Sequence, residues 1–377
     1  MKESIRKVGQ RFMIGFEGLE ASADAKRLIR DYGVGQVIYF ARNVANPEQV
    51  AELSRELQTF ARECGQELPL VIGVDQEGGR VARMGPPWTV WPPLRALGRL
   101  DSEDLARRMG EALAQECLSA GINCDFVPDL DVDTNPDNPI IGNRSFGTDP
   151  DLVGRLGAAM IRGLQGKRVI GSAKHFPGHG DTDKDSHLEL PVVDQPRSRL
   201  YEVEIKPFWK AIEAGVATVM MAHVLYTDLD PDLPASLSPR VVDAILRREL
   251  RYDGVVMTDD LEMKAVAARW APGESAVLAM KAGCDVVPVC GINPHTQVEA
   301  IEGVIRALED EQLSWDSLDT ACTRVRRMKE RFLLPYRDPS PKEARQSAGL
   351  GEWGALALEI SERGGEPMRF PWSAPSS

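Results

Sequence analysis

Residues 254–260 read Gly-Val-Val-Met-Thr-Asp-Asp, a short apolar run that ends at two carboxylates. Similar runs recur along the chain, and each is followed by polar or glycine-rich residues and then by a stretch with helical periodicity. The eight runs span residues 11–16, 35–40, 70–74, 122–127, 169–174, 217–223, 254–258 and 284–289. Eight such units predict an α/β fold, a (β/α)8 TIM barrel, because parallel strands need helical crossovers that cover their outer faces. A doubly wound open sheet is the competing interpretation.

The helices between the runs carry start signals. Asn46-Pro47 and Ser238-Pro239 each precede an amphipathic pattern, as expected of helices that pack on a sheet. From about residue 335 the composition changes to Pro, Ser, Gly and charge. We therefore expect a catalytic barrel over residues 1–334 and a C-terminal tail over residues 335–377 that packs on the barrel or stays flexible.

Composition excludes several classes of function. The 377 residues carry a formal net charge of -12, which argues against binding to nucleic acid or to a membrane surface, since both need a surplus of Lys and Arg. The start of the sequence lacks the apolar run of a signal peptide, and no stretch reaches the roughly 18 apolar residues of a membrane helix. Six scattered cysteines indicate buried, reduced thiols. The sequence predicts a cytoplasmic protein that binds a small molecule.

Polar side chains follow the apolar runs at the positions where a barrel places its active site, the C-terminal ends of the strands. The richest segment is residues 174–187, which hold three of the five histidines in a loop made irregular by glycines and Pro177. Asp185 stands two residues before His187, where its carboxylate can orient the imidazole and raise its pKa if the loop turns back. His295 has no such context and is interpreted as a core or surface residue.

Other interpretations of these polar residues stay open at this point. Histidines with nearby aspartates also suit zinc or iron, although a helical His-x-x-x-His pair is missing. Asp75 and Asp260 could cap helices, the latter a helix beginning at Leu261. Arg83 and Arg144 could be solvated surface charges. Of the adjacent Asp259 and Asp260, only one is expected to face a substrate, because neighbouring residues leaving a strand point to opposite sides.

Four ordered segments, residues 73–83, 138–147, 174–187 and 258–261, resemble glycoside hydrolase family 3, and within it the bacterial β-N-acetylglucosaminidases. The resemblance spans about residues 8 to 334. It implies that Asp259 is the nucleophile and that His187, held by Asp185, is the general acid/base in place of the glutamic acid used elsewhere in the family. It further implies that the sugar is bound by Asp75, Arg83, Arg144, Lys174 and His175.

The implied activity is a retaining β-N-acetylhexosaminidase that acts on terminal N-acetylglucosamine of peptidoglycan-derived muropeptides through a covalent glycosyl-enzyme. This scheme needs no metal or cofactor, and its partner is a small carbohydrate. The alternatives are a β-glucosidase, a phosphate-dependent glycoside phosphorylase, a metallohydrolase and a non-catalytic sugar-binding barrel. The sequence does not decide the sugar, the leaving group or the oligomeric state.

Overall fold

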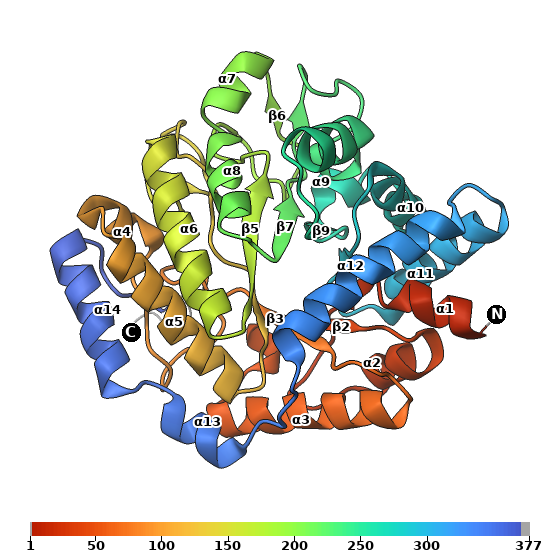
Figure 1. Cartoon of the computed structure of the whole chain (residues 1–377), viewed down its shortest axis with the longest axis horizontal. Coiled ribbons are helices and arrows are strands. Elements are labelled where there is room, and N and C mark those ends of the chain that lie inside the picture. Colours follow the sequence, from red (N-terminus) through yellow and green to blue (C-terminus); the bar gives the residue numbers. More distant parts are fainter. Residues whose placement is uncertain (1, 371–377) are drawn as a thin grey trace.

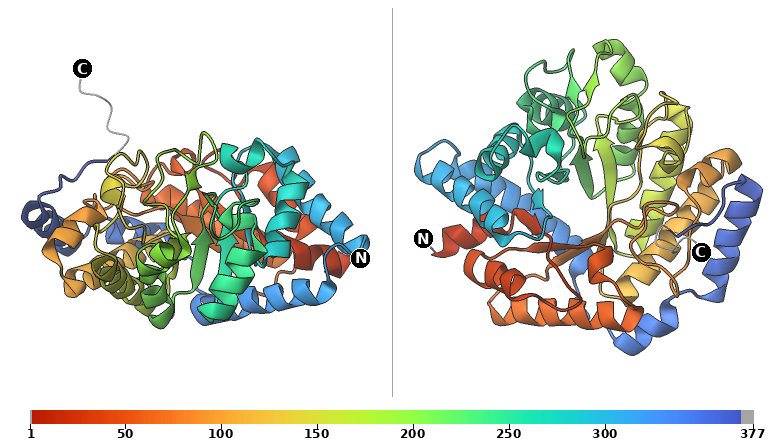
Figure 2. Two further views of the ribbon diagram at one scale, coloured as in Figure 1. Left: turned by 90° about the horizontal axis from the view of Figure 1, so that it is seen from above. Right: turned by 180° about the vertical axis from the view of Figure 1, so that it is seen from behind.

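The computed structural model describes residues 2–370 and contains eight parallel strands curled into a barrel, with helices around it (Figures 1 and 2). The strand order is β10-β1-β2-β3-β4-β5-β7-β9, and a parallel bridge between Met257 and Val286 closes the ring. The strands are β1 (Phe12–Ile14), β2 (Gln36–Tyr39), β3 (Val71–Val74), β4 (Cys124–Asp125), β5 (Ile170–Phe176), β7 (Thr218–Met221), β9 (Val255–Thr258) and β10 (Val287–Val289). All eight predicted strands are confirmed, and the open sheet is excluded.

A small parallel sheet of β6 (Val192–Val193) and β8 (Leu225–Tyr226), not expected from the sequence, lies outside the barrel sheet. The helices are α1 (Lys2–Gly9), α2 (Ala23–Arg27), η1 (Leu28–Tyr32), η2 (Ala41–Asn43), α3 (Pro47–Glu63), α4 (Leu94–Leu100), α5 (Glu103–Ser119), η3 (Gly142–Arg144), α6 (Pro150–Gly166), α7 (Arg197–Glu202), α8 (Lys206–Glu213), η4 (Ala235–Leu237), η5 (Arg240–Glu249), α9 (Lys264–Ala267), α10 (Pro272–Ala282), α11 (Pro294–Glu309), α12 (Trp315–Leu333), α13 (Pro341–Ser347) and α14 (Gly351–Gly364).

Both predicted helix starts are confirmed. The Asn46 side chain accepts a hydrogen bond from the Gln49 N–H at 2.9 Å at the start of α3. The Ser238 hydroxyl accepts one from the Val241 N–H at 3.2 Å at the start of η5. Each side chain satisfies a backbone donor that has no partner within its own helix.

Alternation along the strands divides the core into an inner and an outer layer. In β9, Val255 and Met257 belong to the cluster inside the barrel, whereas Val256 belongs to the cluster between strands and helices. β3 alternates in the same way, and its Gly73 faces inward where an added Cβ would lie 2.8 Å from the Phe126 ring. The alternation carries Asp75 and Asp259, the first residues after these strands, toward the barrel mouth.

Helix α12 closes the opposite end of the barrel. Its side chains Val325, Met328 and Phe332 join the inner cluster together with inward residues of the strands. Figure 1 shows α12 lying across this end in front of the strands. The barrel is therefore filled from its N-terminal end, and open space for a ligand is left at its C-terminal mouth.

The part of the tail that the structure describes forms two helices. α13 packs on α3 and α5, and α14 packs on α4 and α5, along the outside of the barrel (Figure 1). Leu356, Ala357 and Ile360 of α14 are buried in the outer core. The division of the chain near residue 334 into a catalytic domain and a tail stays a prediction, and residues 371–377 lie outside the described part.

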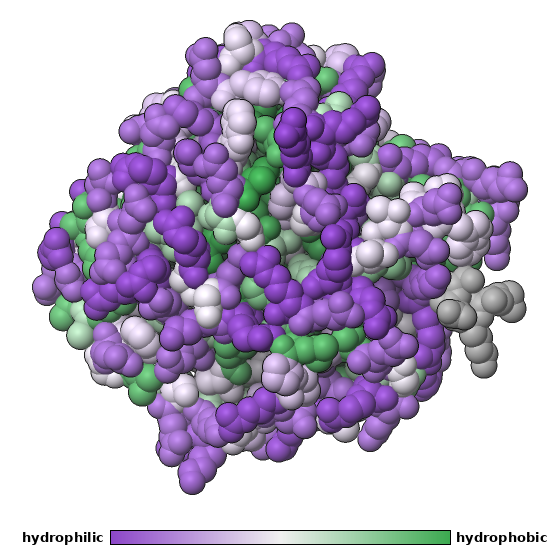
Figure 3. All heavy atoms as spheres, viewed as in Figure 1, coloured by the Kyte–Doolittle hydropathy of each residue, from purple (hydrophilic) through white to green (hydrophobic). Residues whose placement is uncertain are grey.

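The surface agrees with the hydrophilic composition of the chain. On the face shown in Figure 3, hydrophilic side chains dominate and apolar ones form small separate patches. Within residues 2–370, no helix combines the length and the apolar character that a bilayer crossing requires. The six cysteines are free thiols, four of them buried, as predicted.

Candidate active site

A cavity of about 240 Å³ lies at the C-terminal ends of the strands. Its floor is apolar and includes Met13, Phe126 and Met220, and its walls are polar. The structure brings together in these walls seven of the eight residues singled out from the sequence: Asp75, Arg83, Arg144, Lys174, His175, His187 and Asp259. The eighth, Asp185, contacts the cavity through its partner His187.

A buried network of charges joins the ends of β3 and β5. Lys174 Nζ lies 2.9 Å from Asp75 Oδ1 and 2.6 Å from Glu77 Oε1. Arg144 donates to both oxygens of Glu77, at 2.9 Å from Nε and 2.8 Å from Nη2. Burial would raise the pKa of Glu77, but the charges of Arg144 and Lys174 outweigh it and hold that pKa far below its usual range. These groups are therefore fully ionised, and they fix one another in place.

These contacts overturn two of the alternative interpretations. Asp75 does not cap a helix, because its carboxylate is paired with Lys174 and lies 3.5 Å from Arg83 Nη2. Arg144 is not a solvated surface charge, since its side chain is only 9% exposed and bound to Glu77. Arg83 is mostly buried as well and its guanidinium lies 5.9 Å from the centre of the Phe40 ring.

A second network positions His175. Asp131 Oδ2 lies 2.7 Å from His175 Nδ1, and Asp131 Oδ1 accepts the backbone N–H groups of His175 and His179 at 3.2 and 2.6 Å. Burial lowers the pKa of His175, but the Asp131 carboxylate outweighs it, so that the pKa is raised. Asp131 thus holds the imidazole in one orientation in the cavity wall.

The loop that carries His187 is anchored on both sides. His179 lies 2.8 Å from the Thr182 hydroxyl through Nδ1 and 3.1 Å from the Ser186 hydroxyl through Nε2. The Ala265 N–H donates to the Ser186 carbonyl at 3.2 Å. Burial lowers the pKa of His179 to about 4, so this imidazole is neutral and structural at neutral pH.

Asp185 and His187 form the pair that the sequence suggested. Asp185 Oδ1 lies 2.8 Å from His187 Nδ1 and also accepts the His187 backbone N–H at 2.8 Å. Burial raises the pKa of Asp185, but the hydrogen bonds from His187 outweigh it and lower that pKa. The His187 side chain is 62% exposed. The ring is therefore oriented from behind and open to solvent and to a ligand in front.

Asp259 and Asp260 differ in their surroundings. Burial would raise the pKa of Asp259, but the nearby histidines, His175 first, and the Asp260 N–H outweigh it and lower that pKa. Asp260 accepts the N–H groups of Cys290 and Glu262 at 3.0 and 3.1 Å, and burial raises its pKa to about 7. Asp259 is thus an ionised carboxylate in the cavity wall, whereas Asp260 is bound to the backbone.

One expectation about this pair was wrong. Both aspartates border the cavity, and that only one of them faces a substrate stays a prediction. Asp260 does not cap a helix at Leu261, because residues 261–263 form a turn and α9 begins at Lys264. The Glu262 N–H donates to the Asp260 carboxylate within this short turn.

The role of His223, unassigned from the sequence, is structural. This buried side chain lies 2.7 Å from the Ser236 hydroxyl through Nδ1 and 3.0 Å from the Asp260 carbonyl through Nε2. Burial lowers the pKa of His223. The ring therefore ties the backbone of Asp260 to η4 and fixes the position of the neighbouring Asp259.

One group in this region has the composition of a metal site. The ligand atoms of Asp129, Asp131 and His175 lie within 4.8 Å of one another. His175 Nδ1 and Asp131 are already hydrogen bonded to each other, and Asp129 Oδ2 lies 3.3 Å from Arg144 Nη2. The Arg144 guanidinium thus supplies the positive charge that a metal ion would bring, and the donor set is poorly suited to a second cation.

Sequence reasoning did not assign Glu77, Asp131 and His179, which join the predicted residues into networks. Glu77 stands two residues after Asp75, a spacing that predicts the same side of an extended segment, and Asp131 follows the fourth run. These signals mark the residues as candidates. The sequence does not reveal their partners, because these lie far away along the chain: Glu77 and Arg144 have a sequence separation of 67.

Residues 5–328 match the family described as "Glycosyl hydrolase family 3 N terminal domain". With its closed barrel and its polar cavity at the strand ends, the chain is a glycoside hydrolase of the (β/α)8-barrel class. It belongs to glycosyl hydrolase family 3. The family resemblance carried by the sequence segments is thereby confirmed.

Named relatives are similar over nearly the whole chain. A beta-hexosaminidase of Thiobacillus denitrificans is 35% identical, over 90% of this chain and 91% of its own length. Beta-hexosaminidase A of Pseudoalteromonas piscicida is 32% identical over 94% of this chain, which spans 65% of that longer protein.

Solved structures agree with these relatives. A family 3 beta-N-acetylglucosaminidase from Paenibacillus sp. str. FPU-7 superposes with a TM-score of 0.89 at 42% identity, covering 95% of this chain and 68% of that one. A beta-glucoside phosphorylase bound to 2FGlc superposes with a TM-score of 0.85 at 25% identity, covering 96% and 67%. The same barrel is thus shared by proteins named as hydrolases and as a phosphorylase.

Proposed function

We propose that this glycoside hydrolase removes terminal β-linked N-acetylglucosamine with retention of configuration, with Asp259 as nucleophile and His187 as general acid/base. The observation that carries the proposal is that one cavity holds both an ionised Asp259 and the Asp185-oriented ring of His187. The names of the relatives and of the Paenibacillus structure support N-acetylglucosamine as the sugar.

The remaining cavity residues are suited to hold one sugar ring. Asp75, Arg144, Lys174 and His175 are buried or nearly so, and each is fixed by a partner of opposite charge. Such preorganised donors and acceptors bind sugar hydroxyls without first losing side-chain entropy. The volume of about 240 Å³ is below the range of about 300–1,000 Å³ typical of pockets for drug-sized ligands, as suits a single sugar residue.

Two steps complete the reaction. In the first, an Asp259 oxygen bonds to the anomeric carbon while the bond to the leaving oxygen breaks, and His187 gives its proton to that oxygen. In the second, the neutral His187 takes a proton from water, whose oxygen bonds to the anomeric carbon as Asp259 departs. Two inversions give net retention.

The histidine also supports the choice of leaving group. After donating its proton, an imidazole is neutral, whereas a carboxylic acid becomes an anion that would repel a negatively charged leaving group. On this ground we propose peptidoglycan-derived muropeptides, whose lactyl-bearing sugar is anionic, as natural substrates. Faster cleavage of carboxylate-bearing leaving groups than of matched neutral ones is expected, and equal rates would speak against this substrate class.

The compartment is also a proposal. All six cysteines are free, which suits the reducing cytoplasm. Fractionation of cells that produce the native protein should recover the activity with cytoplasmic markers.

Hydrolysis of a panel of nitrophenyl glycosides tests the function. The β-N-acetylglucosaminide should be cleaved much faster than the β-glucoside and the β-xyloside, and NMR should show the β-anomer as the first product. A preference for the glucoside would indicate a β-glucosidase. Binding without turnover of any glycoside would indicate a sugar-binding barrel.

A second candidate, the phosphorylase, is favoured by the structural similarity to the beta-glucoside phosphorylase. A neutral imidazole in the second step tolerates phosphate as acceptor better than a carboxylate would. Sugar phosphate formed only in the presence of phosphate would establish this reaction. Activity lost with a chelator and restored by zinc would instead indicate a metallohydrolase.

A further inference from the structure

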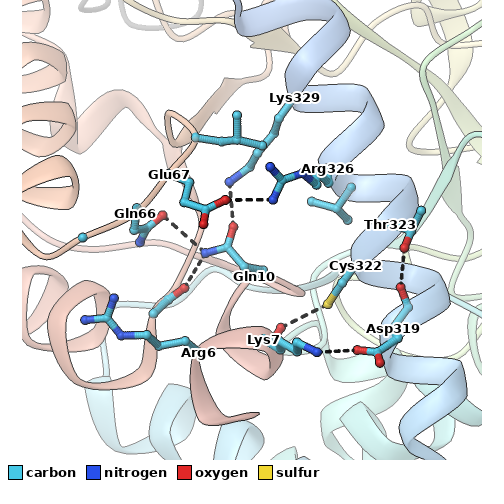
Figure 4. A pocket seen from close by; sticks show the side chains of 14 residues that line it. Arg6, Lys7, Gln10, Gln66, Glu67, Asp319, Cys322, Thr323, Arg326 and Lys329 are labelled. Atoms are coloured by element: carbon cyan, nitrogen blue, oxygen red, sulfur yellow. Dashed lines mark hydrogen bonds and ion pairs between the residues drawn. The ribbon is translucent and has the colours of Figure 1, made fainter. Parts of the chain in front are cut away.

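A second cavity, of about 520 Å³, lies at the end of the barrel opposite the active site (Figure 4). Its walls come from α1, from the residues that lead into β1, β2 and β3, and from α12. Four cationic side chains line it, Arg6, Lys7, Arg326 and Lys329, against two carboxylates, Glu67 and Asp319. It is larger than the active-site cavity and has no part in the mechanism above.

Lys329 is the buried cation of this cavity. The residue is 1% exposed, and Nζ donates to Gln10 Oε1 at 2.9 Å and to the Gly35 carbonyl at 3.0 Å. Among the side chains that the structure describes, those of residues 5–370, no carboxylate lies within ion-pair distance of it. An ammonium carries three N–H donors, so two neutral acceptors leave it one donor and its full charge without compensation. Burial lowers the pKa of Lys329 to about 7.

Of the other cationic side chains of the cavity, two form ion pairs and one does not. Lys7 pairs with Asp319 at 2.9 Å, and Arg326 pairs with Glu67 at 2.9 Å, both on exposed side chains at the rim. Arg6 is half-buried and forms no ion pair among the residues that the structure describes. Figure 4 shows Lys329 joined to Gln10 beside the pair of Glu67 and Arg326, with Arg6 at the side of the cavity. The cavity therefore holds a positive charge on Arg6, and a second one on Lys329 when that amine is protonated, and neither has an ion-pair partner among the described side chains.

We propose that this cavity is a second binding site, for a small organic anion that carries a carboxylate or phosphate group. The anionic group would lie against Lys329, and Arg6 on the same cavity wall would add positive charge. Gln10 and Gln66 hold the wall together, since Gln10 Nε2 donates to the Gly33 carbonyl at 2.7 Å and to Gln66 Oε1 at 3.3 Å. Binding supplies the counter-charge that the buried ammonium lacks, and this compensation is the source of affinity.

The arrangement also links anion binding to protonation. The other titratable and charged side chains that line the cavity with Lys329 are Arg6 and Lys7 from α1, Glu67 before β3, and Asp319, Cys322 and Arg326 from α12 itself. An anion beside the amine favours its charged form, so binding raises the pKa of Lys329 and takes up protons above neutral pH. Affinity for the anion should accordingly fall as the pH rises.

Titration calorimetry on the full chain tests the proposal with sulfate and with succinate, neither of which changes its charge between about pH 7 and pH 8.5. Two buffers of different ionisation heat report proton uptake. We expect binding of at least one anion, tighter at the lower pH and with up to one proton taken up at the higher. Preference for sulfate indicates a phosphate-like ligand, and preference for succinate a carboxylate.

Substitutions of residues that line the cavity test whether the anion binds there. Lys329→Met keeps the apolar stem and should weaken binding roughly ten- to hundred-fold and abolish proton uptake. Arg6→Gln, which tests the site if the first variant fails to fold, should weaken binding and leave proton uptake in place. Lys281→Met, at an exposed lysine of α10, is the control. No binding of either anion, or equal binding by wild type and both cavity variants, would overturn the proposal.

Discussion

Asp259 and Asp260 are neighbouring carboxyl groups whose surroundings shift their pKa values in opposite directions. Histidines and a backbone N–H stabilise the charge on Asp259, whereas burial raises the pKa of Asp260 to about 7. A nucleophile must be ionised, so this difference supports the proposed role of Asp259.

Replacement of Asp259, the proposed nucleophile, should remove the activity. We expect Asp259→Ala to lower kcat by at least about 10⁴-fold on nitrophenyl β-N-acetylglucosaminide, because no covalent intermediate can form. Asp260→Asn is the matched control. Its amide oxygen can still accept the Cys290 and Glu262 N–H groups, and most of the activity should remain. A larger loss of kcat in Asp260→Asn than in Asp259→Ala would indicate that Asp260, and not Asp259, is the nucleophile.

Rates measured on substrates with different leaving groups should test whether His187 is the general acid. His187→Ala should slow a disaccharide with a sugar leaving group by about 10²- to 10⁴-fold and an activated aryl glycoside far less, because only the former needs a proton. Asp185→Asn should show the same pattern more weakly, since the Asp185 carboxylate orients the ring. Equal losses of kcat/KM on both substrates would remove His187 from the acid role.

The pH profile follows from the lowered pKa of Asp259. The carboxylate is fully ionised above the ordinary aspartate pKa of about 4, so kcat/KM for aryl glycosides should fall on the acid side only below that pH. Circular dichroism at each pH separates this effect from unfolding. An acid limb near pH 7 that disappears in Asp260→Asn would show instead that Asp260 must be ionised.

At this scale the sequence predicted which residues reach the cavity, because strand ends meet at one face of a barrel. It could not predict their partners. Asp75 looked equally suited to a helix cap, and only the position of Lys174, 99 residues away, decides against it.

Secondary-structure elements hold the site together through contacts between strand ends. Glu77, after β3, binds Lys174 on β5 and Arg144 at η3, so one carboxylate links three segments. The strands themselves were predicted from their apolar runs. The sequence did not predict that Glu77 links them, because a buried charge is recognisable only when its counter-charges are placed beside it.

Removal of the Glu77 carboxylate should lower the stability of the fold. Glu77→Gln removes the carboxylate that two buried cations share and leaves Lys174 with Asp75 and Arg144 with Asp129 alone. We expect the free energy of unfolding to fall by about 3–5 kcal/mol and KM to rise. Glu189→Gln is the matched control, since its pair with Lys184 is solvent-exposed and should contribute under about 1 kcal/mol. Urea denaturation measures both. Similar values for the two variants would contradict the structural role of Glu77.

The whole molecule is larger than its barrel. The sequence predicted the barrel because eight similar units repeat, but residues 335–370 showed only a change of composition. The two helices found there depend on the surfaces of α3, α4 and α5 against which they pack. Tertiary contacts of this kind are not contained in a local pattern.

Truncation of a buried side chain tests whether α14 belongs to the folded unit. Ile360→Ala should lower the free energy of unfolding by about 2–5 kcal/mol, because Ile360 is fully buried in the outer core. Leu358→Ala, on the same helix at a residue 45% exposed, should change it by under about 0.5 kcal/mol. Thermal denaturation compares the two. No difference between them would show that the barrel is equally stable without the packing of α14.

The closed base of the active-site cavity limits how the enzyme can move along a polymer. Below its floor of Met13, Phe126 and Met220, the barrel is filled and then covered by α12. A bound sugar can leave only through the mouth by which it entered, and a chain cannot thread past Asp259. We therefore expect distributive cleavage: each released monosaccharide must diffuse out before the next chain end can enter, and at high concentration it should compete with substrate.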